Sequence, residues 1–396
     1  MISKKMQKMV KGSSIIRAMF EEGNRLASIY GKENVYDFSL GNPNVPAPKQ
    51  VKESIKMLVD TYEEPALHGY MNNAGFEDVR TKIANSINTK FSTNFNKSNI
   101  IMTVGAAGGI NVIFKTLLDP NDEVITFAPF FGEYTNYADN FDAKLVIVPT
   151  QAPEFYPDLE KLASAITKKT KIVIINNPNN PTGVIYSEDM IIKITKVLEE
   201  KQKELDINIY IFSDEPYREL AYNGTVVPYI TKYYKNTVVG YSYSKSLSLA
   251  GERIGYLVLP TELDCYKDIF DACSVANRIL GFVNAPSLIQ KVVGECLECQ
   301  CDINYYKHNA DLIYNGLTKI GFECVKPQGA FYLFVKSPIE DEKEFCQMAK
   351  KYNILLVPSS AFGCRGYIRL AYCVATKTIQ NSLPNFEKLY QDIKNK

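Results

Sequence analysis

Tryptophan is absent from this chain of 396 residues, and histidine occurs only twice, as His68 and His308. An excess of one charge is also missing, because 45 lysines and arginines face 44 aspartates and glutamates, for a net charge of +1. A chain without a net positive field has nothing that would attract nucleic acid or an anionic membrane surface. We therefore expect a small-molecule partner, and neither nucleic acid nor a membrane.

Long hydrophobic runs are missing as well. No apolar stretch approaches the roughly 20 residues of a membrane-spanning helix, and no apolar signal-peptide core stands near the first residue. The sequence therefore predicts a cytoplasmic protein. The basic opening MISKKMQKMVKG is short, and we interpret it as an arm that packs on the body of the protein or on a neighbouring subunit.

The nine cysteines are odd in number and scattered, which favours free thiols in a chain without a secretory signal. Only ECLECQC, with Cys296, Cys299 and Cys301, has a spacing like that of metal ligands. A structural zinc site needs a complete tetrahedral set of cysteines or histidines, which this segment does not supply. We expect no metal and interpret these cysteines as small apolar residues of a helix, with their role left open.

Short β-branched runs alternate with helix-length segments between Asn99 and Pro260. The runs are NIIMTV, DEVITFAP, KLVIVPT, KIVIINNP, NIYIFSDEP, TVVGYSYS and YLVLP. This alternation predicts an α/β fold with a mainly parallel sheet flanked by helices. The segment SEDMIIKITKVLEEKQKELD has helical periodicity, and Ser187 is its expected N-cap.

The pattern changes after about Leu280. A long helical stretch over residues 285–320 precedes GAFYLFVKS, ILLVPSS and YIRLAYC, which predicts a second, smaller α+β domain. The length of the chain also favours two domains. We predict an N-terminal arm over residues 1–40 that packs with the small domain or a partner subunit, a large domain over 41–280 and a small C-terminal domain over 281–396.

Distinctive residues follow the ends of several predicted strands. IIMTV leads into GAAGG (residues 105–109), IVIIN into NPNNPTG (177–183), IYIFS into DEPY (214–217), and VVGYS into YSK with Lys245. Each alone could be a turn, a helix cap or a solvated lysine. Ligands of open α/β sheets collect beyond the carboxyl ends of the strands, and free N–H groups at a helix start suit a phosphate. Because all four motifs are expected at one edge of the sheet, the sequence predicts a ligand site there.

Together these motifs resemble the class I/II family of aminotransferases that depend on pyridoxal phosphate, of the aspartate aminotransferase-like kind. SYSKSLSLAGERIG (residues 242–255) satisfies every position of the family's lysine signature, and NNPTG, DEPYREL and YIRLAY follow in the expected order. The resemblance extends from about Asp37 to Tyr372. It implies the transferase fold called fold type I, pyridoxal 5'-phosphate as cofactor, and a homodimer.

The resemblance also implies roles for individual residues. Lys245 would carry the cofactor as a Schiff base and later move the substrate proton, and burial beside cations would help its amine to lose a proton. Asp214 would keep the pyridine nitrogen protonated. Tyr217 and Asn180 would contact the ring oxygen, whereas Asn177 is expected to be structural.

The phosphate would lie on the backbone of Gly105, Ala106 and Ala107, with Ser242 and Arg253 completing its site. Many relatives carry Ser, Thr or Lys in this loop, so the two alanines can offer only backbone donors.

Two aromatic residues also match the family pattern. Phe131, in PFF, would stack on the cofactor where relatives often carry tryptophan, although a core phenylalanine is the alternative. Tyr70, in HGYMNNAG, resembles the tyrosine that reaches the phosphate of the neighbouring subunit.

Arg369 carries the prediction about the substrate. A charged residue within an apolar strand needs a partner, and a guanidinium binds a carboxylate through paired hydrogen bonds. The family uses this arginine, with Asn180 and the backbone of Gly41, for the substrate α-carboxylate; a structural ion pair is the alternative. Arg278 lies near the position where some relatives bind a side-chain carboxylate, but a surface arginine fits equally.

The expected activity is transfer of an amino group from an L-amino acid, aspartate-like as a guess, to a 2-oxo acid such as 2-oxoglutarate by a ping-pong mechanism. A C–S lyase or other eliminating enzyme of the same fold, or an aminotransferase for apolar or aromatic donors, is the alternative. A pyridoxal-phosphate-sensing transcription regulator would need a DNA-binding domain before Asp37, and we expect that segment to be too short for one. A nicotinamide dehydrogenase would need the motif G-x-G-x-x-G, which this sequence lacks.

Overall fold

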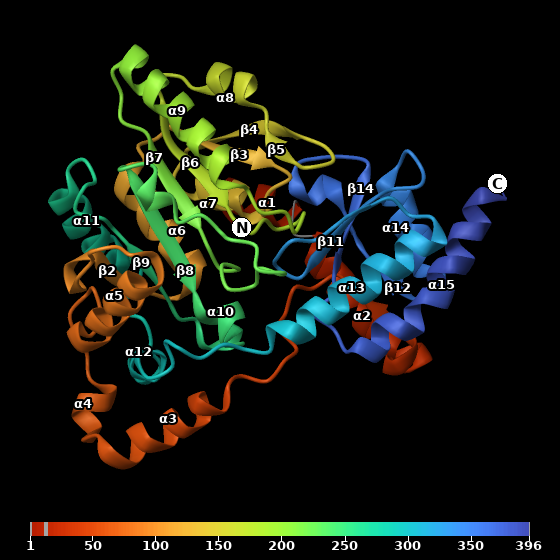
Figure 1. Cartoon of the computed structure of the whole chain (residues 1–396), viewed down its shortest axis with the longest axis horizontal. Coiled ribbons are helices and arrows are strands. Elements are labelled where there is room, and N and C mark those ends of the chain that lie inside the picture. The colour runs from red at the N-terminus through yellow and green to blue at the C-terminus, as the bar shows by residue number, and fades with distance from the viewer. Residues whose placement is uncertain (1, 12–14, 396) are drawn as a thin grey trace.

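The larger sheet organises the molecule. The computed structural model describes residues 2–11 and 15–395 and places the strands of this sheet in the order β2-β9-β8-β7-β6-β3-β4-β5 (Figure 1). Their bounds are β2 Ile100–Thr103, β3 Glu123–Ala128, β4 Lys144–Gln151, β5 Tyr156–Pro157, β6 Thr170–Asn176, β7 Tyr210–Asp214, β8 Thr237–Ser242 and β9 Gly255–Val258. Neighbouring strands are parallel except where β9 or β5 takes part, which confirms the predicted α/β sheet.

Helices cover both faces of this sheet, so most of its strands are buried along their length, whereas β4 near one edge is partly exposed. Ile172 and Ile174 of β6 pack in the same cluster as residues of α6 (Gly105–Leu117), α7 (Glu133–Asn140) and α11 (Tyr266–Ile279). Val173 and Ile175 pack on the other side with α8 (Leu159–Ala165) and α9 (Glu188–Leu205). The predicted cap of α9 is present, because the Ser187 side chain accepts from the Met190 N–H.

The strand register aligns the carboxyl ends that carry the predicted motifs. Asn176, the last residue of β6, lies opposite Asp214, the last residue of β7, which in turn lies opposite Gly240 of β8. Gly255 at the start of β9 lies opposite both Thr103 of β2 and Ser242 of β8. The segments after β2, β6, β7 and β8 therefore leave the sheet at one edge.

A smaller antiparallel sheet lies beside the larger one, in the order β10-β11-β14-β13 (Figure 1). Its strands are β10 Cys324–Val325, β11 Tyr332–Lys336, β13 Val357–Pro358 and β14 Tyr367–Ala371. The helices of this part are α13 Ile303–Ile320, α14 Glu342–Lys350 and α15 Thr376–Lys394. The α+β character predicted for the C-terminal part is therefore present.

The N-terminal segment packs partly on this C-terminal part. It forms α1 (Lys4–Lys11), α2 (Ile15–Tyr30), η1 (Lys32–Asn34) and β1 (Tyr36–Asp37), which pairs with β12 (Ile354–Leu355). Leu26 and Val35 pack on Leu355, and Lys5 Nζ lies 3.0 Å from Asp142 Oδ1 beside the larger sheet. The predicted arm over residues 1–40 and the domain limits stay predictions.

The remaining elements are α3 Lys49–Thr61, α4 Glu64–His68, α5 Glu77–Phe91, η2 Lys97–Asn99, η3 Ile230–Lys232, α10 Tyr243–Ser246, η4 Ala250–Glu252, α12 Ser287–Gly294 and η5 Ser359–Phe362. Of these, α3, α5 and α12 contribute to a further hydrophobic cluster. Within residues 2–11 and 15–395, no helix has the length and apolar character needed to cross a membrane.

The helical stretch predicted over residues 285–320 is wrong in its middle. α12 ends at Gly294, and α13 begins at Ile303 after Asp302, whose side chain accepts from the Tyr305 N–H. The cysteines of ECLECQC lie in the turn between these helices, where the Cys301 N–H donates to the Ser246 carbonyl at 2.8 Å. The hydrogen bond from Cys301 to Ser246 and the N-cap formed by Asp302 explain why the helix is interrupted between Gly294 and Ile303. The described part contains no cluster of metal-binding side chains.

Candidate active site

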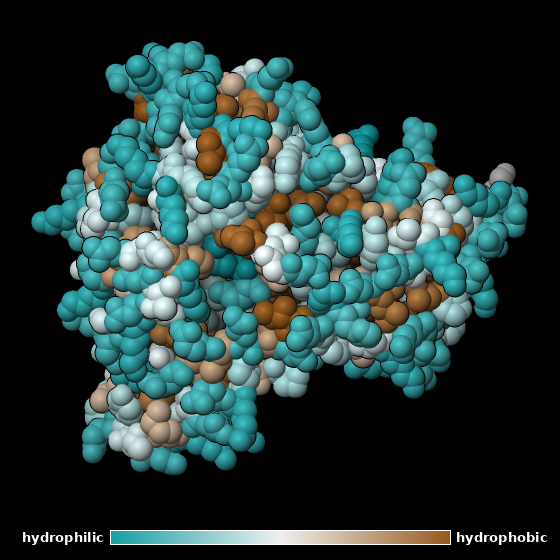
Figure 2. All heavy atoms as spheres, in the orientation of Figure 1, coloured by the Kyte–Doolittle hydropathy of each residue, from teal (hydrophilic) through white to brown (hydrophobic). Residues whose placement is uncertain are grey.

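A cavity of about 400 Å³ lies at the carboxyl ends of β6, β7 and β8, and Tyr332 of β11 and Arg369 of β14 complete its wall. This volume falls within the usual range for small-molecule sites. In Figure 2 hydrophobic side chains gather over the junction between the parts that hold the two sheets. The predicted site residues that line the cavity are Gly41, Ala106, Ala107, Phe131, Asn180, Asp214, Tyr217, Ser242, Lys245, Arg253 and Arg369.

Lys245 reaches this cavity from α10, directly after β8. The Ser242 hydroxyl caps α10 by accepting from the Ser244 N–H at 3.2 Å, and Lys245 Nζ donates to the Gly41 carbonyl at 2.8 Å. Burial lowers the pKa of Lys245 to about 8; the Cys373 thiol opposes this shift, and Arg253 adds to it. The amine can therefore lose its proton close to neutral pH.

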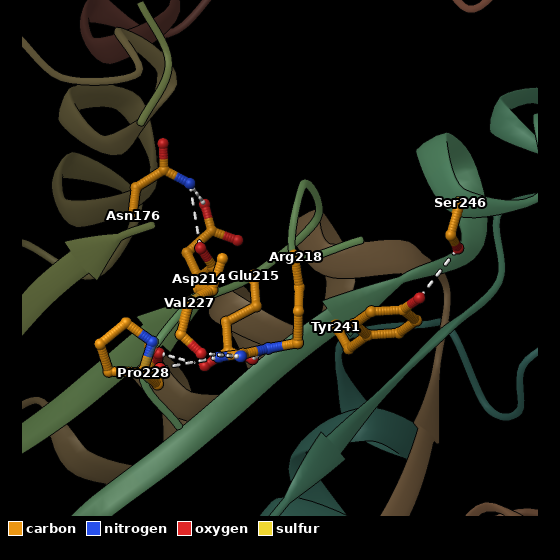
Figure 3. Close-up of polar contacts among 9 residues, drawn as sticks. Asn176, Asp214, Glu215, Arg218, Val227, Pro228, Tyr241 and Ser246 are labelled. Atoms are coloured by element: carbon orange, nitrogen blue, oxygen red, sulfur yellow. Dashed lines mark hydrogen bonds and ion pairs between the residues drawn. The ribbon is translucent and has the colours of Figure 1, made fainter. Parts of the chain in front are cut away.

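Asp214 faces the same cavity from the end of β7. Asn176 Nδ2 donates to the Asp214 carbonyl at 3.0 Å and to Oδ2 at 3.3 Å (Figure 3). The buried Tyr134 hydroxyl also donates to Oδ2. Burial raises the pKa of Asp214 to about 7; the Tyr134 hydrogen bond opposes this, and Glu215 adds to it. A buried carboxylate with neutral donors but no cationic partner suits a protonated ring nitrogen.

Residues close to Asp214 and Lys245 in the sequence form a second set of polar contacts, outside the cavity lining. Arg218 Nε forms an ion pair with Glu215 Oε2, and Arg218 Nη1 donates to the Val227 carbonyl at 3.0 Å (Figure 3). On the neighbouring strand β8, the Tyr241 hydroxyl donates to Oγ of Ser246 at 2.8 Å. Ser246 directly follows Lys245 in the sequence. These bonds fix the segment that follows Asp214 and the short helix that carries Lys245.

The first turn of α6 and Arg253 form the end of the cavity predicted for the phosphate. Gly105 has a φ of +74°, and a Cβ there would lie 2.8 Å from Arg253 Nη2. Arg253 itself has a φ of 53°, and its Nη1 donates to the Ala250 carbonyl at 2.8 Å. A glycine is thus needed at residue 105, where the Arg253 guanidinium lies against the start of α6. The guanidinium and the free N–H groups of the helix start both suit an anion.

Arg369 is buried, with 2% of its surface exposed. Its Nη1 donates to Asn180 Oδ1 at 3.2 Å and its Nη2 to the Ser39 carbonyl at 2.6 Å, while its Nε has no hydrogen-bond partner. No carboxylate of the described residues pairs with it, so the structural ion pair considered from the sequence is not formed there. A buried guanidinium with an unused donor suits an incoming carboxylate.

Gly41 lies directly beneath Tyr332, because a Cβ on Gly41 would collide with the Tyr332 hydroxyl. That hydroxyl is 2.8 Å from the Tyr217 hydroxyl. The loop therefore reaches Lys245 and the cavity only with glycine at this position.

Residues 33–384 match the family described as aminotransferase class I and II. The chain belongs to this family. It is 30% identical to a probable aspartate aminotransferase of Methanocaldococcus jannaschii, over 90% of this chain and 93% of that protein. It is 28% identical to aromatic-amino-acid aminotransferase 2 of Thermococcus litoralis, over 92% and 94%. The structure of an amino transferase from Eubacterium rectale superposes with a TM-score of 0.96 at 47% identity, covering 99% of both chains.

Pyridoxal phosphate, which this aminotransferase family implies, fits the cavity by three observations. Lys245 offers an amine with a lowered pKa, Asp214 a buried carboxylate without a cation, and Gly105 a helix start beside Arg253. Each matches a different end of the cofactor: its aldehyde carbon, its ring nitrogen and its phosphate.

Some lining residues of the aminotransferase were missed in the sequence. Asn176 ends the run IVIIN, so the strand-end rule could have found it one residue earlier than the predicted loop. Tyr134 and Tyr332 are two of 26 tyrosines and carry no local signal. Asn177 is structural, as predicted, because its side chain bonds the backbone of Tyr186 in both directions.

Tyr70 and Arg278 lie outside the cavity of their own chain. Tyr70 follows α4 and has 94% of its surface exposed, so its predicted role could be exercised only toward another subunit. Arg278 is exposed near the end of α11 and does not line the cavity, as expected of a surface helix arginine.

Proposed function

We propose that this aminotransferase holds pyridoxal 5'-phosphate in the cavity and transfers the amino group of an L-amino acid to a 2-oxo acid. The observation that carries the proposal is the meeting of the Lys245 amine, the Asp214 carboxylate and the unpaired Arg369 guanidinium around one cavity. A covalent anchor, a partner for a ring nitrogen and a carboxylate receptor together suit an amino acid substrate.

The cofactor would be held by groups that the structure brings together. Lys245 would bond it covalently, and Asp214 would pair with its ring nitrogen. Asn180 and Tyr217 would contact its ring oxygen, and Phe131 would stack on its ring. The phosphate would bind the first turn of α6 (Gly105, Ala106 and Ala107), Ser242 and Arg253.

The residues of the chain would then act on the substrate directly. Arg369 would bind the α-carboxylate with Asn180 and the backbone of Gly41, which fixes the α-carbon in the cavity. Lys245 would take the proton from that carbon and return it, and its lowered pKa suits this exchange near neutral pH. When bound, pyridoxal phosphate supplies the electron sink that lets the α-carbon lose its proton.

The assembly and location belong to the same proposal. We infer a homodimer in which Tyr70 reaches the phosphate site of the other subunit, supported by its near-complete exposure in the single chain. The cytoplasmic location stays a prediction. The relatives include a probable aspartate aminotransferase and an aromatic-amino-acid aminotransferase, so they leave the amino donor open.

Product analysis tests transfer against elimination. A panel of amino acids is incubated with pyruvate or 2-oxoglutarate, and the new amino acid, ammonia and the 2-oxo products are quantified. We expect the new amino acid to form in equal amount to the 2-oxo acid derived from the donor. Release of ammonia in place of a new amino acid would instead identify an eliminating enzyme.

A further inference from the structure

Glu133 is an acidic cavity residue that no proposed role uses. It begins α7, two residues after Phe131, and lines the same cavity as Lys245 and Arg369. Asp214, the other carboxylate in the wall, is held by Asn176 and Tyr134. Glu133 is therefore free of the bonds that fix the proposed cofactor site.

The negative charge of Glu133 is not neutralised by a neighbouring cation. Its Oε2 accepts from Asn136 Nδ2 at 2.9 Å, and no lysine or arginine of residues 2–11 and 15–395 forms an ion pair with it. Tyr137, one turn further along α7, also lines the cavity. Burial raises the pKa of Tyr137 to about 12, and the charge of Glu133 adds to this shift. The charge of Glu133 therefore reaches the Tyr137 hydroxyl, which belongs to a residue of the cavity wall.

The cations of the cavity all have other proposed partners. Lys245 would bond the cofactor, Arg253 its phosphate and Arg369 the substrate α-carboxylate. Arg278 lies outside the cavity of its own chain. Among the described residues of the single chain, no cationic side chain of the cavity wall remains for a second substrate carboxylate, whereas Glu133 lines that wall without an ion pair.

We propose that Glu133 determines substrate specificity by favouring donors whose side chain ends in a cation, such as diamino acids, and disfavouring dicarboxylates. This inference rests on the proposed function and specifies its donor. A substrate ammonium would gain a charge-assisted hydrogen bond with Glu133, whereas a substrate carboxylate would meet like charge. Both half-reactions use one site, so pyruvate is also the expected acceptor over 2-oxoglutarate.

Glu133→Gln tests the inference, because glutamine keeps the shape and removes the charge. The kcat/KM is measured for ornithine, lysine, leucine, aspartate and glutamate with pyruvate as acceptor. We expect the wild type to prefer ornithine or lysine over aspartate by about tenfold or more. The variant should lose about tenfold with these donors and gain about tenfold with aspartate, while leucine changes by no more than about twofold.

Glu154→Gln is the matched control, because Glu154 is exposed and lies outside the cavity. This variant should leave the ratios of kcat/KM between the donors unchanged. A wild type that prefers aspartate, with ratios that Glu133→Gln does not move, would overturn the inference while leaving the aminotransferase proposal intact. Absence of cofactor absorbance and of transfer from every donor would instead overturn the proposed function, and this inference with it.

Discussion

At the residue scale, burial moves the two central pKa values toward each other. The pKa of Lys245 falls to about 8 and that of Asp214 rises to about 7, in both cases chiefly because the charged form loses water. The hydroxyl of Tyr134 and the amide of Asn176 donate hydrogen bonds to the aspartate. Among the described residues, the Lys245 amine donates one hydrogen bond, to the Gly41 carbonyl, and otherwise faces the rings of Tyr217 and Phe331. Asp214 is thus suited to pair with a bound cation, and Lys245 is suited to lose its proton.

The lowered pKa of Lys245 predicts how cofactor-free protein takes up pyridoxal phosphate. The neutral amine is the nucleophile, and its fraction rises as the pH passes the pKa, so the association rate should rise through about pH 8. Rapid-mixing absorbance measurements between about pH 6 and about pH 10 give the midpoint. A midpoint at the ordinary lysine value of about 10.4 would show that burial does not act on this amine.

Tyr134→Phe removes the hydroxyl that donates to Asp214. The pKa of Asp214 should rise further, because this hydrogen bond opposes the effect of burial. Loss of a hydrogen bond to a buried carboxylate costs about 1.5–3 kcal/mol, so pyridoxal phosphate should bind roughly 10- to 100-fold more weakly. Equilibrium titration followed by absorbance measures this affinity.

Tyr234→Phe is the control for that change. Its buried hydroxyl donates to the Ile209 carbonyl at 2.8 Å, away from the cavity lining. This variant should lose stability and keep its cofactor affinity. Equal weakening in both variants would mean that Tyr134 acts only through the general stability of the fold.

At the element scale, strands were easier to predict than helix limits. Each β-branched run of the larger sheet became a strand. All of these strands except β4 are buried along most of their length, which is why their sequences are continuously apolar. The break between Gly294 and Ile303 had one local signal, the N-cap residue Asp302, which we overlooked. The Cys301 contact with Ser246, far away in sequence, gave no signal. The strand-end rule likewise predicted Asp214 and Lys245, whereas Tyr134 reaches Asp214 from a helix and gave no signal.

The start of α6 gives a prediction about an element. Gly105→Ala places a side chain at positive φ and against Arg253, so we expect a stability loss of about 1–2 kcal/mol. Affinity for pyridoxal phosphate should fall as well, because Arg253 must move from the helix start. Thermal unfolding and cofactor titration measure the two effects.

Gly251→Ala offers the comparison in the neighbouring short helix η4. A Cβ at Gly251 would meet nothing within 4 Å, so this variant should behave as the wild type in both measurements. An equally harmless Gly105→Ala would refute the tight contact between Arg253 and the first turn of α6.

At the scale of the whole molecule, the predicted phosphate ligand Tyr70 does not line the cavity of its own chain. Tyr70 is exposed outside the cavity, so only a second subunit could receive its hydroxyl. Tyr70→Phe should weaken pyridoxal phosphate binding by about tenfold, since one hydrogen bond to a charged group is lost. Sedimentation should still report a dimer, and Tyr30→Phe on α2 should change neither property. A monomeric wild type would exclude this role.

The central claim is that Lys245 holds the cofactor. Holoenzyme is reduced with borohydride, which fixes pyridoxal phosphate to the amine that binds it, and the modified peptide is located by mass spectrometry. The account predicts the label on Lys245, with none in Lys245→Ala. A label on a different lysine of the wild type, or no label in protein that catalyses transfer, would contradict it.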